Sequence, residues 1–294
     1  MKKIETLTYT NTHGESVVFA HGSLYSPQSV EGLTNVRNTL YSINSMGQDG
    51  DTFVANRIES RDIDISGAIR ERDPDKMRDA RRNLARVLNP QMAATLTYQY
   101  GDFIRMIACR SINAPTISKS PQSPYTLFTV QLSCLNPFWR ERNESRDDIA
   151  AWIGGLEFPL EIPSPPDGLI MGYRQPSLIV NVYNAGDVDT GIRVEFRALG
   201  EVMNPIITNV DTRDALKLNL RMEDGDVLTV STGYGEKWAQ LNRGGLITDA
   251  LRYVDVDSIF LQLAPGDNLM RYNTDDGLNN LEVSIFHSNL YLGV

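Results

Sequence analysis

The stretch Leu132-Ser133-Cys134-Leu135-Asn136-Pro137-Phe138-Trp139 ends a β-patterned first half of the chain and leads into a charged run at 140–148. A strand cannot continue through Asn136-Pro137, because proline has no backbone N–H to donate to a sheet. Phe138 and Trp139 follow at once, and aromatic side chains bury roughly 150–250 Å² each. Two interpretations stay open for them: a plug between two domains of one chain, or a contact with a neighbouring chain.

The composition is that of an ordinary globular protein. The chain has 294 residues, which predicts two domains, and 41% of them are hydrophobic and 22% charged. The formal net charge of -9 argues against nucleic-acid recognition and against anionic membranes, since both need clustered Lys and Arg. No apolar run is long enough to predict a membrane span, and the polar N-terminus predicts no signal peptide.

Strand patterns fill most of the first half. Residues 61–70 alternate apolar and polar side chains with the two-residue period of a half-buried strand. Strands are also predicted at 95–100 and 103–110, joined by a tight hairpin at Gly101-Asp102. A last strand is predicted at 125–135.

One helix, predicted at residues 74–88, interrupts the strands. Asp73 is a good N-cap, Pro74 suits the first helical position, and Asn89-Pro90 ends the helical spacing. The polar face carries four arginines: Arg78, Arg81, Arg82 and Arg86. The spacing predicts i,i+3 ion pairs of Asp75 with Arg78 and of Asp79 with Arg82. Two interpretations stay open, namely that the helix covers a sheet of its own domain, or that its arginine face meets an acidic surface on another subunit.

The segment at 41–57 is polar, contains glycine and has a weak pattern. Such a long segment inside a compact domain is usually functional or mobile. We expect an extended hairpin that reaches outward.

The second half begins with a proline-rich segment at 158–166, which predicts an extended chain without a core. Short strands are then predicted at 178–183, 192–198, 206–210, 216–221, 227–231, 259–263 and 281–287, separated by turn sequences such as that at 264–267. This pattern predicts a β-sandwich or jelly roll. The predicted domains are 1–140, a linker or extension at 141–176, and 177–294.

No constellation of residues predicts catalysis, a metal site or a cofactor. The three histidines, His13, His21 and His287, belong to no motif with ligand spacing. Acidic turns such as 275–277 follow from turn chemistry without a calcium ion. Cys109 and Cys134 lie in strand-like runs and predict buried thiols made in a reducing compartment, with a disulfide left open because their strands can be neighbours.

Four segments in this order resemble the distal tail proteins of long-tailed bacteriophages. They are 132–139, 184–191, 204–209 with 224–230, and 263–272. The resemblance implies a mainly-β fold, with a ring-forming N-terminal β-domain that carries one α-helix and a C-terminal galectin-like β-sandwich. It implies a structural hub that is not an enzyme.

The resemblance also implies partners and a location. It predicts a homo-hexameric ring, with the tail tube protein on one side and the tail tip or tail-associated protein on the other. Receptor-binding proteins are possible further partners. The protein would be synthesised and assembled in the bacterial host cytoplasm and would end at the tail tip of the virion.

Two alternatives belong to other functional classes. One is a carbohydrate-binding module for attachment to the host cell wall, for which the candidate aromatic residues are Tyr234, Trp238, Tyr253 and Tyr272, although each is more often core or rim. The other is a tail-associated hydrolase. For the hub, the excursion at 41–57 is a candidate subunit contact, together with a set of candidate interface residues: Arg78, Arg81, Arg82, Arg86, Phe138 and Trp139.

Overall fold

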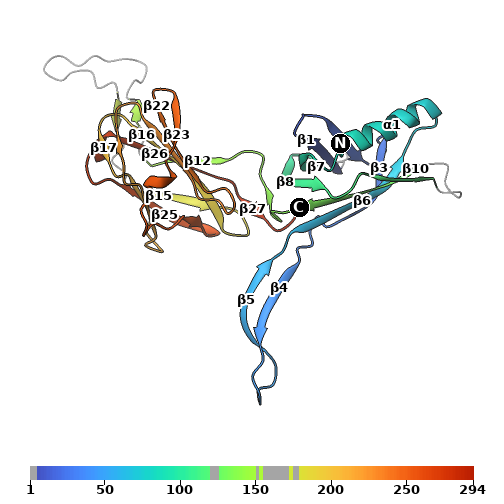
Figure 1. Cartoon of the computed structure of the whole chain (residues 1–294), viewed down its shortest axis with the longest axis horizontal. Helices are drawn as coiled ribbons and strands as arrows, with labels where there is room; N and C mark the ends of the chain where they lie inside the picture. The colour runs from blue at the N-terminus through green and yellow to red at the C-terminus, as the bar shows by residue number, and fades with distance from the viewer. Residues whose placement is uncertain (1–4, 120–125, 150–151, 155–171, 175–178) are drawn as a thin grey trace. The chain divides into compact units, whose positions relative to one another are not determined.

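The structure, a computed structural model, describes residues 5–119, 126–149, 152–154, 172–174 and 179–294. It contains two compact units, each with its own hydrophobic core (Figure 1). Unit 1 consists of Met1–Arg142 and Leu290–Val294, and unit 2 of Asn143–Asn289. The described residues form mostly strands and one α-helix, so the predicted mainly-β fold is confirmed. The proline-rich segment at 158–166 lies outside the described residues.

The elements of unit 1 follow the sequence pattern closely. They are β1 (Glu5–Asn11), β2 (Ser16–Ala20), β3 (Tyr25–Glu31), β4 (Asn38–Ile43), β5 (Thr52–Ile58), β6 (Arg61–Ile69), α1 (Pro74–Val87), β7 (Ala93–Tyr100), β8 (Phe103–Ser111), β9 (Thr116–Lys119), β10 (Thr126–Cys134), β11 (Trp139–Arg140) and β27 (Leu290–Tyr291). The predicted hairpin at Gly101-Asp102 joins β7 to β8. The strand predicted at 125–135 is β10, which ends at Cys134, and Tyr125 lies outside the described residues.

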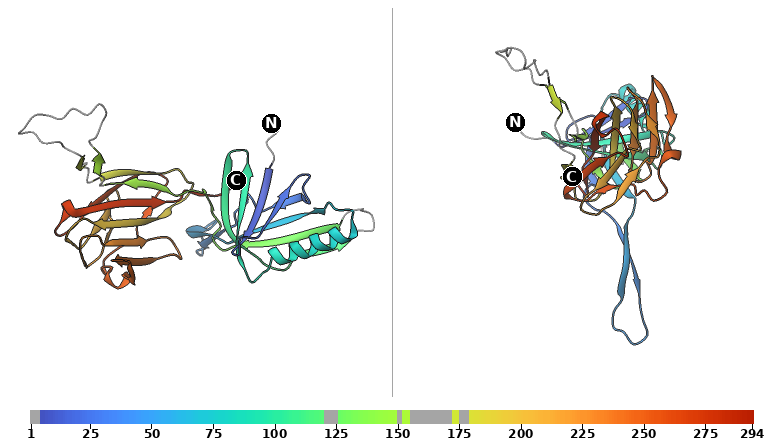
Figure 2. Two further views of the ribbon diagram at one scale, coloured as in Figure 1. Left: turned by 90° about the horizontal axis from the view of Figure 1, so that it is seen from above. Right: turned by 90° about the vertical axis from the view of Figure 1, so that its left-hand side faces the viewer.

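The large sheet of unit 1 closes on itself (Figure 2). Its strand order is β27-β11-β8-β7-β1-β2-β3-β6-β10-β9, and β8 also pairs with β10. The pairings are antiparallel except for one parallel bridge between Phe19 of β2 and Tyr25 of β3. The strands from β8 round to β10 therefore form a barrel, which leaves no free edge along that path.

Alternate residues of the strands fill the barrel, as the two-residue period requires. Ile63 and Ile65 of β6 are fully buried, as the pattern at 61–70 predicted. The rings of Phe19, Tyr25 and Phe128 pack together with centroid distances of 5.7 to 6.3 Å. These aromatic contacts join β2, β3 and β10 into one core.

The helix begins where the sequence predicted it. The carboxylate of Asp73 caps it by accepting hydrogen bonds from two backbone N–H groups of the first turn, at 2.9 and 3.3 Å. Ala80, Leu84 and Val87 are buried, and the hydroxyl of Tyr25 donates to the carbonyl oxygen of Ala80 at 2.9 Å. Since Leu84 is fully buried, its truncation to alanine would cost about 2–5 kcal/mol.

A long hairpin leaves unit 1 between β3 and β6 (Figure 1). Its strands, β4 and β5, pair with each other and belong to no larger sheet among the described strands. This hairpin, residues 38–58, is called the arm below. It spans the excursion predicted at 41–57.

The end of the chain returns to unit 1. β27 pairs with β11, with Trp139 opposite Tyr291. The chain thus passes between the units twice, after Arg142 and after Asn289. The domain limits at 140 and 177 stay a prediction. That prediction did not include the return of residues 290–294 to unit 1.

Unit 2 consists of short strands and two 3-10 turns. They are β12 (Ser145–Asp148), β13 (Trp152–Gly154), β14 (Gly172–Arg174), β15 (Ile179–Asn184), β16 (Thr190–Ala198), β17 (Val202–Met203), β18 (Ile206–Asn209), β19 (Ala215–Lys217), β20 (Arg221–Met222), β21 (Val227–Ser231), β22 (Trp238–Arg243), β23 (Leu246–Asp249), η1 (Leu251–Tyr253), β24 (Gln262–Leu263), β25 (Gly266–Asn273), η2 (Leu278–Asn280) and β26 (Leu281–His287). The strand predicted at 216–221 is interrupted, and the one predicted at 259–263 pairs only at Gln262–Leu263.

Two antiparallel sheets of unit 2 share one core. Their orders are β12-β26-β16-β21-β22-β23, with β24 also paired to β16, and β15-β25-β18-β19. Phe196 and Ile285 of the first sheet lie in the same buried cluster as Ile207 and Met270 of the second. This is the sandwich-like packing that the strand and turn pattern predicted.

Parts of the charged run at 140–148 form strands, and the linker or extension at 141–176 stays a prediction. Arg140 belongs to β11, and β12 adds an edge strand beside β26. Arg193 reaches Glu144 at 2.6 Å, so an ion pair supports this edge. Charged residues suit an edge strand because they discourage pairing with other chains.

Candidate functional site

The stretch that ends the first half, residues 132–139, belongs to unit 1. Trp139 and, from β6, Arg61 form a buried cluster there, which is called the lock below. Trp139 is fully buried, and its indole N–H donates to the carbonyl oxygen of Leu33 at 3.0 Å. Its ring meets that of Tyr98 nearly edge-on, with 6.5 Å between centroids. Phe138 beside it is half-buried. The expectation that Trp139 contacts a neighbouring chain is corrected, because its side chain has no surface left for a partner to cover.

Arg61 completes this lock from β6. Its guanidinium is buried and donates to the carbonyl oxygens of Gly32 (2.8 Å), Leu33 (2.6 Å) and Pro137 (2.9 Å), and to that of Leu292. Burial lowers the pKa of Arg61, but an arginine in a protein stays charged. The charge is therefore met by four carbonyl dipoles, which join the root of the arm, the junction stretch and the returning C-terminal segment.

The arginines of α1 fall into two groups. In the first, Nη2 of Arg81 donates to Oγ1 of Thr126 at 3.0 Å, and Arg86 forms an ion pair with Glu15 at 2.5 Å. Thr126 and Glu15 belong to the barrel and its first turn. Arg81 and Arg86 therefore hold the helix on its own unit.

Arg78 and Arg82 form the second group and are exposed to solvent. Arg78 contacts Asp75 at 3.4 Å and Asp79 at 3.6 Å. The pair predicted between Asp75 and Arg78 is present, whereas Asp79 meets Arg78 rather than Arg82. Exposed ion pairs contribute at most about 1 kcal/mol. Arg78 would therefore lose little free energy if it exchanged these pairs for contacts with a partner. The interface role of Arg78 and Arg82 stays a prediction.

Charge is divided unequally between the two units. Unit 1 has 17 Lys and Arg against 14 Asp and Glu, a net charge of +3, and unit 2 has 11 against 23, a net charge of -12. Residues 70–86 hold 7 of these basic residues and 4 of the acidic ones. This segment, which includes α1, therefore accounts for the whole positive excess of unit 1.

The arm exposes large apolar side chains on both of its faces. Leu40 is 65% and Phe53 62% exposed, and Met46 at the tip is fully exposed. Directly opposed residues of an antiparallel pair share a face, and neighbours along a strand alternate. Leu40 and Tyr41, both exposed, therefore lie on opposite faces. Soluble monomers rarely leave such a strip in water, which marks the arm as a surface for association.

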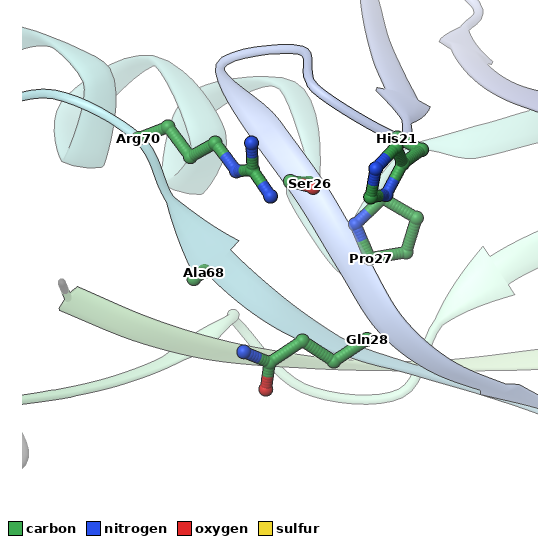
Figure 3. A pocket seen from close by; sticks show the side chains of 6 residues that line it. All are labelled: His21, Ser26, Pro27, Gln28, Ala68 and Arg70. Carbon is green, nitrogen blue, oxygen red and sulfur yellow. The ribbon is translucent and has the colours of Figure 1, made fainter. Parts of the chain in front are cut away.

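A cavity of about 330 Å³ opens on the outside of the barrel wall (Figure 3). Its floor is made by Ser26 of β3 and Ala68 of β6, which are cross-strand partners and both buried. Figure 3 shows the side chains of Arg70 and His21 on either side of Ser26. Gln28 also lines the cavity. The recess therefore combines a cation, an imidazole, an amide and a hydroxyl.

A β-bulge shapes this cavity. The register of β3 against β6 shifts between Pro27 and Ser29, which leaves Gln28 as the extra residue. Opposite it, a Cβ on Gly67 would come within 2.4 Å of the carbonyl oxygen of Ser26, so only glycine fits. Bulges redirect side chains and are common beside functional sites.

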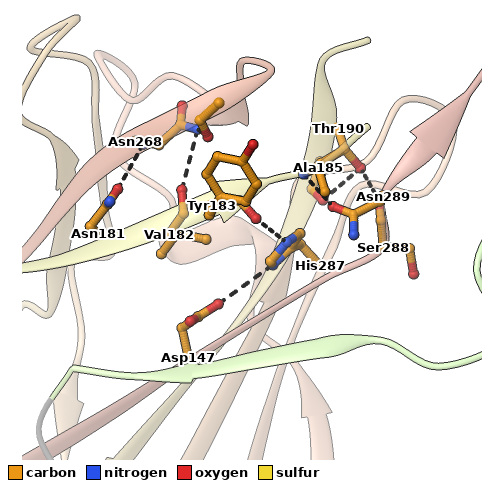
Figure 4. A network of polar contacts seen from close by, with 12 residues as sticks. Asp147, Asn181, Val182, Tyr183, Ala185, Thr190, Asn268, His287, Ser288 and Asn289 are labelled. Carbon is orange, nitrogen blue, oxygen red and sulfur yellow. Dashed lines mark hydrogen bonds and ion pairs between the residues drawn. The ribbon is translucent and has the colours of Figure 1, made fainter. Parts of the chain in front are cut away.

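In unit 2, a buried histidine holds the edge strand β12 (Figure 4). Nε2 of His287 lies 3.3 Å from the carbonyl oxygen of Tyr183, and Nδ1 lies 3.7 Å from a carboxylate oxygen of Asp147. Burial raises the pKa of Asp147, and His287 offsets part of that rise. A neutral imidazole has one N–H and serves one of these acceptors, whereas an imidazolium serves both.

The four aromatic residues considered for sugar binding do not share one exposed surface. Tyr272 is buried in the core, Trp238 and Tyr253 are half-buried, and Tyr234 is exposed. The described residues contain no group of three or more His, Cys, Asp or Glu side chains placed to hold a metal ion. No helix in the described ranges has the length and apolar character to cross a membrane.

Sequence reasoning missed the cavity and the apolar strip on the arm. His21 was considered only as a metal ligand, and Arg70 only as the end of a strand. The signal for the arm was present in Leu40, Tyr41 and Phe53, which are large apolar residues in a segment without a core.

Two known families match the chain in succession. Residues 13–134 match the phage tail protein RIFT-related domain, and residues 185–289 match the C-terminal domain of the siphovirus-type tail component. Among solved structures, the Dit protein of phage SPP1, described as a paradigm of the hub adsorption apparatus in phages that infect Gram-positive bacteria, is similar with a TM-score of 0.66. It is 12% identical, and the likeness covers 97% of this chain and 98% of that chain. No curated protein sequence matches the chain significantly.

A second solved structure, the baseplate of phage P2 in its activated conformation with calcium, contains a similar chain. The TM-score is 0.52 at 10% identity, and the likeness covers 98% of each chain. At these identities the two structures establish a shared fold.

The two family matches fall one on each unit, and together they define a structural protein of bacteriophage tails. More narrowly, the chain belongs to the siphovirus distal tail protein family, the hub components of the tail and baseplate, as the sequence resemblance predicted. A hub component of the tail is part of the virion.

Proposed function

We propose that this protein forms a homo-hexameric ring that joins the tail tube to the tip of the phage tail. The observation that carries the proposal is the arm, whose apolar side chains are exposed on both faces although the barrel beside it is closed. A closed barrel offers little free edge for association, so the arm is the natural means of joining copies. We propose a ring as the form of this assembly because the chain belongs to the distal tail protein family.

The charges of the two units support ring contacts made by unit 1 rather than by unit 2. Unit 1 has a net charge of only +3, so six copies of it repel one another weakly, whereas six copies of unit 2 would repel strongly at -12 each. We therefore assign the ring contacts to unit 1. Unit 2, proposed to be galectin-like, would serve the other partners.

The proposed partners are the tail tube protein on one side of the ring and the tail tip or tail-associated protein on the other. Receptor-binding proteins are further candidates for unit 2. The role is structural rather than catalytic, and synthesis and assembly would take place in the host cytoplasm. The carbohydrate-binding alternative is not carried forward, because Tyr234 alone of its four aromatic residues is exposed.

Light scattering on the purified protein, followed by negative-stain imaging, tests the proposal. We expect particles of six times the chain mass and an annular outline. A variant in which residues 38–58 are replaced by a short glycine-serine turn should stay folded and lose the ring. A wild-type protein that stays monomeric, and that forms no ring in purified tails either, would contradict the proposal.

A further inference from the structure

We propose that the arm tip of one copy docks in the cavity beside Arg70 and His21 of the next copy. This inference rests on the proposed function, because it names the contact that would join neighbouring subunits of the ring. Three features support it: the charge of the tip, the chemistry of the cavity, and their positions on the same pair of strands.

The arm tip is acidic and protrudes. Asp49 and Asp51 are the only charged residues between 38 and 56, and both are exposed. Gly47 and Gly50 have φ values of +85° and +78°, a left-handed backbone that favours glycine and makes a tight turn. The carboxylate of Asp51 accepts a hydrogen bond from Ser42 at 3.0 Å, which ties it to the arm itself. Asp49 is therefore the carboxylate best placed to enter another surface.

The cavity offers donors that suit a carboxylate. Arg70 supplies a cation with a fork of N–H groups, and His21 and Gln28 add further N–H groups. The hydroxyl oxygen of Ser26 accepts the N–H of Gly22 at 3.3 Å, which leaves its own proton to donate. A volume of about 330 Å³ holds an aspartate side chain with part of its turn. The adjoining segment 70–86 is the basic part of unit 1, so the surroundings attract the acidic tip as well.

The positions of arm and cavity require two copies. The arm leaves the strand pair β3–β6 near the end where Glu31 lies opposite Asp64, and the cavity lies toward the other end, where Ser26 lies opposite Ala68. The arm also extends away from the barrel (Figure 1), so it cannot fold back into its own cavity. A contact between the arm of one copy and the cavity of the next is heterologous, and such contacts close into rings when their rotation closes.

Charge exchange tests this contact. Asp49→Arg alone and Arg70→Asp alone should each raise the protein concentration at the midpoint of ring assembly at least tenfold at low salt. Combining the two substitutions in one chain should restore assembly to within about threefold of wild type, since the pair is recreated with opposite charges. Asp102→Arg, on the exposed β7–β8 turn, is the matched control and should change nothing. Circular dichroism should confirm that all variants stay folded.

Disulfide trapping gives an independent measurement in purified tails as well as in solution. Copies carrying Asp49→Cys, mixed with copies carrying Gln28→Cys and oxidised, should yield covalent dimers, whereas Asp102→Cys in place of Asp49→Cys should not. Rings that form normally in all single variants and give no cross-link would overturn the inference while leaving the proposed function intact. Charge reversal in unit 2, by Asp255→Lys and Asp257→Lys, serves as a comparison. If it weakens assembly and Asp49→Arg does not, the inference is likewise overturned and the proposed function stands. Absence of any ring from wild-type protein and from tails would instead defeat the proposed function.

Discussion

Arg61 and Trp139 donate hydrogen bonds to the same carbonyl oxygen, that of Leu33, at 2.6 and 3.0 Å. Leu33 lies just before the arm, and Gly32 before it has a φ of +87° and no room for a Cβ beside the carbonyl of Asp62. The base of the arm is therefore fixed to the barrel by a buried cation and a buried indole. A rigid base lets contacts at the tip of the arm position the whole subunit.

Trp139→Phe should destabilise unit 1 by about 1–3 kcal/mol, because the oxygen of Leu33 loses a donor and the core loses volume. Chemical denaturation followed by hydrogen exchange should show lower protection in β6 and β10. Trp238→Phe, a half-buried change in unit 2, is the control and should leave those strands unchanged. Equal protection of unit 1 in wild type and Trp139→Phe would contradict the lock.

Deleting residues 290–294 should destabilise unit 1 and leave unit 2 unchanged. The deletion removes β27 from β11 and takes from Arg61 the carbonyl oxygen of Leu292. A buried guanidinium that loses an acceptor costs about 1–3 kcal/mol. Calorimetry should show a lower melting temperature for one of two transitions, and hydrogen exchange should assign it to the barrel. A uniform shift of both transitions would be evidence against two independent cores.

The two groups of arginines on α1 should respond differently to charge reversal. Arg78→Glu combined with Arg82→Glu should leave the free energy of unfolding within about 1 kcal/mol and weaken self-association, because both side chains face solvent. Arg81→Glu combined with Arg86→Glu should lower stability more, since these side chains bond to Thr126 and Glu15. Light scattering and thermal melts on the two double variants separate these effects. Unchanged assembly with Arg78 and Arg82 reversed would remove them from the interface.

Unit 2 should lose stability in acid through Asp226. Burial opposes ionisation of this carboxyl, but hydrogen bonds from Arg243, the closest at 2.6 Å, and from the N–H of Glu223 outweigh it and hold its pKa below the ordinary 3.8. The folded state therefore binds this proton less readily than the unfolded state. The pair stabilises unit 2 fully above about pH 5, and the contribution disappears as the pH falls through the lowered pKa.

Asp226→Asn provides the check on that assignment. At neutral pH the variant should be less stable than wild type by about 1–3 kcal/mol, because Arg243 loses its charged acceptor. The difference should shrink below pH 4, where the wild-type carboxyl begins to take up its proton. A stability difference that does not change between pH 7 and pH 3 would contradict the role of this carboxylate.

The sequence predicted those elements whose local pattern, such as apolar alternation or a capping sequence, matches their burial and ends in the structure. Ile63 and Ile65 alternate in a strand that is buried on one face, and Asp73 with Pro74 marks a helix start that the structure keeps. β25 was predicted only as a turn at 264–267, because proline and glycine at its start hid the strand that follows. β23 was missed because all four of its residues are exposed, so burial leaves no period to detect.

The candidate site was less predictable for a physical reason. The cavity depends on a bulge at Gln28 and on the close approach of Gly67 to β3, and neither is visible in hydrophobic periodicity. For Trp139 the sequence left two interpretations open, a plug within the chain or a contact with a neighbouring chain, because the size of an aromatic side chain requires burial but does not say against what. Its burial against Leu33 depends on long-range pairing that no local pattern encodes.

The two cysteines should be unreactive in the folded protein. Cys109 of β8 and Cys134 of β10 are buried free thiols, and their mutual hydrogen bond, together with burial, raises the pKa of Cys109 well above its usual value. The thiolate is the reactive form. A thiol reagent at neutral pH should therefore label neither residue until denaturant is added. Rapid labelling of the native protein would show that the barrel opens locally.

Cryo-electron microscopy of purified tails tests the central claim most directly. The account predicts a six-fold ring where the tube meets the tip, with the barrel of unit 1 in the ring and each arm on the adjacent subunit. A reconstruction in which this chain is monomeric, or is absent from that junction, would contradict it.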